Sequence, residues 1–137
     1  QMDIDSGTQT RMFHFNSAAP ARQRLEWQGY SAASWESLAV AVGRGRRDEA
    51  PTQLQVTTTR MRAGFLRRNG IPYSENAVLE EWYDRFTEPN GDDWLVVTSI
   101  VTDPEYLTEP YATTNHFRKL PDLTGWDPTP CRADQAR

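Results

Sequence analysis

Four arginines near the middle of the chain are the first candidates for binding chemistry. Arg60, Arg62, Arg67 and Arg68 surround a glycine and an Asn-Gly turn, in a segment without lysine. The guanidinium group holds carboxylates and phosphates through two parallel hydrogen bonds. The spacing therefore predicts a loop that binds an anion or an acidic partner. In the alternative interpretation the segment is a solvated connection, and its arginines pair with three glutamates that follow it, Glu75, Glu80 and Glu81.

The tryptophans offer a second kind of site. Trp27, Trp35, Trp82 and Trp94 lie within or beside segments with strand character. Such rings can line a cavity for an apolar or sugar-like ligand. In a domain of this size they more often form the hydrophobic core itself. Both interpretations of the aromatic residues stay open at this point.

Histidines and carboxylates give little support for a metal or catalytic centre. His14 and His116 are the only histidines, and a zinc site needs three or four protein ligands. A glycosidase needs two carboxylates that face each other across a cleft, and the sequence places no such pair. The chain also has no G-x-S-x-G, P-loop or G-x-G-x-x-G motif. We therefore expect no metal site, no catalytic residues and solvated acidic side chains.

Cys131 is the only cysteine, so no disulfide can form within the chain. In a secreted protein, a single cysteine suggests a disulfide to a partner or to a segment outside this sequence. The alternative is an unpaired thiol in a tail. Its Pro-rich surroundings supply no neighbouring base and do not suit a thiolate nucleophile.

Composition limits the function classes. The chain has 137 residues, a net charge of −4 and 37% hydrophobic residues, which fits one domain. No apolar run reaches the roughly 18–20 residues of a membrane span. The acidic balance argues against nucleic-acid binding, which needs a cationic surface. Five Trp, five Tyr and five Phe suffice for a core, which excludes global disorder.

The elements that must position these residues read mainly as β-strands. Met2 to Phe15 alternates and predicts a strand pair or one bent strand, with a turn at Asp5-Ser6-Gly7. Asn76 to Phe86 fits either a helix or a strand. The turn residues after it and the clear strand that follows favour a hairpin. Strands are also predicted over Leu54–Met61, Trp94–Thr102 and Tyr111–Lys119.

These strands predict a mainly β fold, either an antiparallel meander sheet or a small β-barrel. We expect a single β domain over residues 1–120, with a mobile Gly/Arg loop near 43–51. Residues 121–137, where Pro and Gly recur, are predicted to form an extended tail.

Several segments together resemble a family of secreted or periplasmic bacterial β-rich proteins without an established activity. The resemblance spans roughly Thr8 to Cys131. It is carried by Trp27–Ser31 with Trp35-Glu36, Val56–Gly64, Arg67–Ser74 and Val101–Pro110.

The resemblance implies a periplasmic or extracellular location and further chain upstream, including a signal peptide. We therefore expect this chain to lack the family's N-terminal part. It also departs from shorter relatives through the Gly/Arg loop at 43–47. Similar sequences favour a strand over a helix for residues 76–86. No catalytic residue and no cofactor follow from the resemblance.

We predict a secreted, non-catalytic β-domain that acts through binding or assembly with another protein chain, or with a missing N-terminal segment. An unpaired edge strand is a template for such pairing. The alternative is a small-ligand carrier or sensor with an aromatic-lined barrel. A second alternative, an extracellular hydrolase, rests only on the surplus of carboxylates. No cofactor, nucleic acid or membrane span is expected.

Overall fold

The computed structural model describes residues 1–17, 19–20, 22, 24–36, 53–67 and 70–130. Within these ranges the chain forms strands and turns and no helix, which confirms the mainly β prediction. The described residues therefore contain no helix that could span a membrane. The predicted loop at 43–51 lies outside the described residues.

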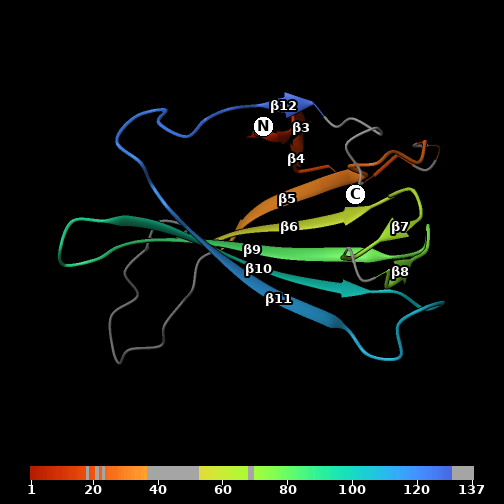
Figure 1. Ribbon diagram of the computed structural model, residues 1–137. Helices are drawn as coiled ribbons and strands as arrows, with labels where there is room; N and C mark the ends of the chain where they lie inside the picture. The colour runs from red at the N-terminus through yellow and green to blue at the C-terminus, as the bar shows by residue number, and fades with distance from the viewer. Residues whose placement is uncertain (18, 21, 23, 37–52, 68–69, 131–137) are drawn as a thin grey trace, which may run out of the picture.

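One six-stranded sheet forms the body of the molecule (Figure 1). Its strand order is β11-β10-β9-β6-β5-β4. No closed barrel forms from the described strands, because β4 and β11 lie at opposite edges. The strands are β4 (Phe13–Phe15), β5 (Tyr30–Glu36), β6 (Gln53–Thr59), β9 (Val78–Thr87), β10 (Asp93–Thr102) and β11 (Tyr111–Arg118).

The sheet is mixed, so the antiparallel prediction holds only in part. Strands β9, β10 and β11 form the expected antiparallel meander. Strand β4, in contrast, pairs with β5 in parallel. A parallel pair cannot be joined by a tight turn and needs a long connection, which the segment between Phe15 and Tyr30 supplies.

The ambiguous segment 76–86 is a strand. Its register with β10 runs from Val78 opposite Thr102 to Thr87 opposite Asp93. Two backbone hydrogen bonds close the turn between this strand and β10. Glu88 N donates to Asp92 O at 2.9 Å, and Gly91 N donates to Glu88 O at 2.9 Å. The apolar residues that also fitted a helix are divided between the two faces of the strand.

Three short strand pairs complete the fold. The N-terminal hairpin consists of β1 (Met2–Ile4) and β3 (Gln9–Arg11). It is the strand pair that was one of the two predictions for this segment. A second hairpin joins β7 (Gly64–Phe65) to β8 (Pro72–Tyr73), within a stretch expected to be irregular.

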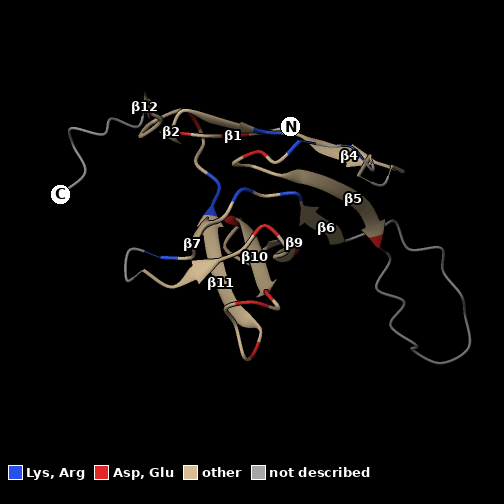
Figure 2. Cartoon of the chain, turned by 90° about the vertical axis from the view of Figure 1, so that its right-hand side faces the viewer, with Lys and Arg blue, Asp and Glu red and all other residues tan. Residues whose placement is uncertain are grey.

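The described part of the tail contacts the N-terminal segment. Strand β12 (Thr129–Pro130) pairs in parallel with β2 (Ser6–Gly7). Asp127 N also donates to Asp5 Oδ2 at 3.1 Å. In Figures 1 and 2, β12 and the N-terminal strands lie together on one side of the large sheet.

The core has two parts on the same side of the sheet. One contains Ala33, Val56, Tyr83 and Val97, with Met2 and Phe13 of the N-terminal segment packed against it. The other is made by Met61, Ala77 and Val101 and is covered from the β7–β8 hairpin by Leu66 and Tyr73. The sheet is therefore covered by short segments rather than by a second sheet.

Gly29 gives a test of how closely its turn packs against the end of β6. Its φ is +62°, and a Cβ there would lie 2.5 Å from the Thr59 carbonyl oxygen. We expect Gly29→Ala to lower the free energy of unfolding by about 2–4 kcal/mol, from backbone strain and the clash. Gly91→Ala is the matched control, since φ is +91° but the space is open. It should cost only the strain, about 1–2 kcal/mol. Equal losses in urea denaturation would contradict the clash.

Asp103 gives a second test, through pH. It is 1% exposed, and its Oδ1 accepts hydrogen bonds from Glu105 N at 2.7 Å and Tyr106 N at 3.1 Å, while Oδ2 accepts from Ser74 N. Burial alone would raise the pKa of Asp103, but these donors outweigh it and lower the pKa below 3.8. The folded state therefore gains stability above pH about 4, and this gain disappears on acidification.

We expect Asp103→Asn to lower the free energy of unfolding at neutral pH by about 1.5–3 kcal/mol, because charge-assisted hydrogen bonds are lost. The variant should also lose less stability than the wild type between pH 5 and pH 2. Asp122→Asn, in an exposed turn where Oδ1 accepts from Thr124 N at 2.8 Å, is the control and should change stability little. Denaturant unfolding across this pH range measures both effects.

Candidate functional site

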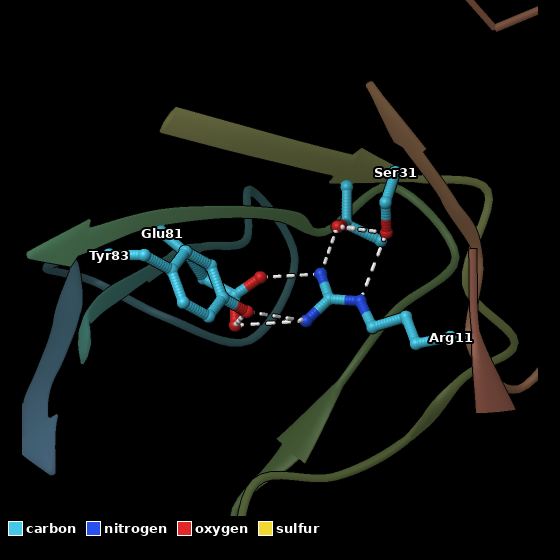
Figure 3. Close-up of polar contacts among 5 residues, drawn as sticks. Arg11, Ser31, Glu81 and Tyr83 are labelled. Carbon is cyan, nitrogen blue, oxygen red and sulfur yellow. Dashed lines mark hydrogen bonds and ion pairs between the residues drawn. The ribbon is translucent and has the colours of Figure 1, made fainter. Parts of the chain in front are cut away.

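A buried ion pair lies on the core side of the sheet. Arg11 of β3 and Glu81 of β9 are each 6% exposed. The guanidinium contacts the carboxylate through two groups, Nη1 with Oε1 at 3.0 Å and Nη2 with Oε2 (Figure 3). Such a two-pronged contact is the strongest geometry available to an arginine and a carboxylate.

The remaining donors of Arg11 are also used. Nε donates to Ser31 Oγ at 3.0 Å, Nη2 to Thr58 Oγ1 at 2.6 Å, and Nη1 to Tyr83 Oη at 3.3 Å. An arginine has five N–H groups, and these contacts occupy all five. Arg11 therefore has no free donor with which to bind an anion.

The surroundings keep the ion pair neutral as a unit. Burial, followed by the nearby charge of Glu81, raises the pKa of Tyr83 to about 12. Tyr83 thus stays protonated at neutral pH, and its Oη donates to Glu81 Oε1 at 3.3 Å. The carboxylate is balanced by the guanidinium, so no net charge remains in the cluster.

The sheet register explains why these groups meet. Ser31 lies opposite Thr58, and Glu81 lies on the next strand opposite Val56, so all three project on the same side. Arg11 reaches across β5, β6 and β9 from the N-terminal hairpin, and this contact fastens the hairpin to the sheet. The role that follows for Arg11 and Glu81 is structural.

Beside the ion pair lies a hollow of about 320 Å³, which we call the Trp27 hollow. Met61, Leu66, Leu79 and Val101 supply apolar surface. The side-chain amides of Gln9 and Gln28 supply polar surface, and Gln28 Nε2 donates to Gln9 Oε1. The other lining residues are Arg11, Trp27, Thr58, Phe65 and Tyr73.

The predicted arginine loop does not form one site. Arg62 lies over the Trp27 ring, 5.3 Å from its centroid, and its Nε donates to Leu25 O at 3.2 Å. Arg67 lies over a different ring, Tyr111, at 5.4 Å. Arg60 has a φ of 59° and is exposed, and Arg68 lies outside the described residues. Glu81, expected as a partner of this loop, is paired with Arg11 instead.

The four tryptophans do not share a cavity either. Trp27 is 67% exposed at its hollow, and Trp35 is 57% exposed and stacks on Phe15 with centroids 6.3 Å apart. Trp82 alternates with Tyr83 and lies half-buried on the opposite side of the sheet. Trp94 lines a second hollow, and within the described structure its buried Nε1 has no hydrogen-bond partner. Neither Trp27 nor Trp35, therefore, belongs to the core.

The histidines are far apart. His14 is on β4 and His116 is on β11, at opposite edges of the sheet and five strand spacings apart, about 24 Å. His14 stacks on Tyr30 with centroids 4.2 Å apart. Among the residues described, no three His, Cys, Asp or Glu side chains are grouped to hold a metal ion. Cys131 lies outside this part of the chain.

Sequence reasoning missed the Arg11 cluster. The sequence pattern marks Arg11 only as one residue of an alternating strand, and it predicts Glu81 to be one of several solvated carboxylates. A Glu at an alternate position between Leu79 and Tyr83 was the available signal, since it shares their face. Its partner is 70 residues away, and no local pattern identifies it.

Comparisons with protein-family models, curated proteins and solved structures give no match. The resemblance to secreted bacterial β-rich proteins stays a prediction.

The structural role of the ion pair can be tested by removing its members. We expect Arg11→Met to lower the free energy of unfolding by about 3–5 kcal/mol, because it leaves the Glu81 charge buried without a partner. The double variant Arg11→Met with Glu81→Leu should recover part of that loss, because it removes both charges.

Chemical denaturation of the two single variants and the double variant measures this coupling. Arg85→Met is the control, since Arg85 forms an exposed ion pair with Asp93 at 3.2 Å and should contribute at most about 1 kcal/mol. Strictly additive losses for Arg11 and Glu81 would contradict the structural role of this ion pair.

Proposed function

We propose that this domain is non-catalytic and acts by assembly, through addition of a strand at the edge formed by β11. The observation that carries the proposal is the position of β11 as the last strand of the described sheet, with eight residues. The opposite edge strand, β4, has only three residues. Long edge strands expose unpaired backbone groups that can pair with another chain. The setting we propose is the periplasm or extracellular space, as the sequence resemblance implies.

The backbone groups that face outward on β11 follow from one hydrogen bond. Lys119 N donates to Asp93 O at 2.8 Å, so residue 119 turns its N–H toward β10. Backbone groups alternate in direction along a strand, and odd-numbered residues of β11 therefore face β10. The β11 edge consists of the outward groups of Ala112, Thr114, His116 and Arg118.

The side chains of β11 carry few of the features that protect an edge. The strand has no proline and no lysine, and its one charged residue, Arg118, stands at its end. Phe117 is 55% exposed on this strand. An edge without charges along its length can pair with an identical edge, because no like charges face each other.

We therefore assign the partner as a second copy of the chain, with the two β11 strands antiparallel about a two-fold axis. Centred on Thr114, this register places Ala112 of one copy opposite His116 of the other. It also places Phe117 of one copy opposite Tyr111 of the other, on the core side of the joined sheet. Aromatic cross-strand pairs of this kind contribute roughly 0.2–1 kcal/mol each.

The Thr114 N–H provides the test. Proline at an outward edge position removes one donor per copy and leaves the hydrogen bonds to β10 in place. We expect Thr114→Pro to raise the dimer dissociation constant at least about tenfold, as measured by sedimentation equilibrium. Thr114→Ala keeps the N–H and is the matched control, so it should stay close to the wild-type value.

Thermal unfolding should show that Thr114→Pro remains folded. A wild-type protein that is monomeric at all concentrations would overturn the proposal. A dimer that both variants leave intact would place the interface elsewhere. A heavier assembly with a different protein would replace the second copy by that protein as the partner.

A further inference from the structure

We infer that the Trp27 hollow binds a small, uncharged ring compound with an apolar body and one hydrogen-bonding end. This inference is independent of assembly at the β11 edge. The hollow is lined by the turn that carries Trp27 and Gln28, by β3 and β6, by the β7–β8 hairpin, and by Leu79 and Val101 of the meander.

Charge decides the class of ligand. Arg11 is the one charged residue among those that line the hollow. Its charge is balanced by Glu81, and its five N–H groups are already used. Arg62 stands over the Trp27 ring but is not among the residues that line the hollow. Among the lining residues, an anion would find only neutral amide donors, and a cation would find no free carboxylate. A charged ligand would therefore lose its hydration without a compensating partner.

The volume of the hollow limits the size of the ligand. The volume of about 320 Å³ is at the small end of known ligand sites. A cavity of about 150 Å³ holds one benzene ring, so the hollow accommodates roughly two fused rings. Met61, Leu66, Leu79 and Val101 offer the apolar surface that such a body needs.

The polar end of the ligand is set by the residues around Trp27. Gln28 Nε2 donates to Gln9 Oε1, and Gln9 Nε2 donates to Ser6 O at 2.9 Å. One N–H of each amide and the Gln28 Oε1 are then left for a hydroxyl or carbonyl group. The Arg62 guanidinium covers one face of the exposed Trp27 indole. Trp27 lines the hollow and is 67% exposed, and we infer that its remaining exposed surface stacks on a ligand ring.

The fold holds these two residues in place. Gly29 N donates to Glu26 O at 3.2 Å and closes the turn whose central residues are Trp27 and Gln28. Glu26 is itself tied to the sheet, since Glu26 N donates to Arg60 O and Arg62 N donates to Glu26 O. The turn is therefore anchored on both sides, so a ligand would find the ring and the amide already positioned.

The test uses 2-naphthol as the uncharged probe and 2-naphthoate as its anionic counterpart, titrated into ¹⁵N-labelled protein. We expect 2-naphthol to shift the indole N–H signal of Trp27 saturably, with at least about fivefold weaker binding of 2-naphthoate. Trp27→Ala should weaken 2-naphthol binding about five- to tenfold, the effect of one aromatic contact.

Trp35→Ala is the matched control, because Trp35 is similarly exposed but stacks on Phe15 away from the hollow. It should leave the affinity for 2-naphthol unchanged. Equal weakening by both substitutions, equal affinity for the two probes, or no saturable shift would overturn the inference. Both replaced side chains are exposed, so folded spectra are expected for both variants.

Discussion

The arrangement of the described strands depends on one requirement, that the face of the sheet carrying Val56, Tyr83 and Val97 must be covered. The described residues form no second large sheet, so the cover comes from two small ones, the N-terminal hairpin and the β7–β8 hairpin. Arg11 fastens the first of these by reaching over three strands to Ser31, Thr58 and Glu81. A charged group in the interior is tolerated because every donor has an acceptor. Arg11 and Glu81 are each 6% exposed, so little water reaches the contact.

Alternating sequence patterns predicted the central strands well. The run from Trp94 to Thr102 is rich in Val and Ile and becomes β10, and its turn fixes the hairpin with β9. Strand β5 carried a weaker signal, because its Ala and Ser residues favour no particular element. Its position follows from pairing with β6 and β4, which only the folded chain provides. The parallel pairing of β4 was likewise invisible to local patterns.

The candidate site was less predictable than the fold. Arginines that are neighbours in sequence lie over different aromatic rings, because Arg62 precedes the β7–β8 hairpin and Arg67 lies in the loop that connects its strands. The tryptophans lie on different faces of the sheet or at turns, so the number of tryptophans in the sequence does not predict a shared cavity. The hollow instead combines residues from distant segments. Trp27 was the one predicted residue that lines it, together with Gln28, Thr58 and Leu79, which had drawn no attention.

The distance along the chain between contacting residues has a consequence for how the molecule reaches this state. Arg11 and Glu81 are 70 residues apart, and Asp127 meets Asp5 across 122 residues. The meander of β9, β10 and β11 needs only short loops and can form first. Before the N-terminal hairpin packs on the sheet, the Glu81 carboxylate remains hydrated on the face that is buried in the folded state. Closing such long loops is slow, so we expect the last step of folding to be the one that dehydrates the core.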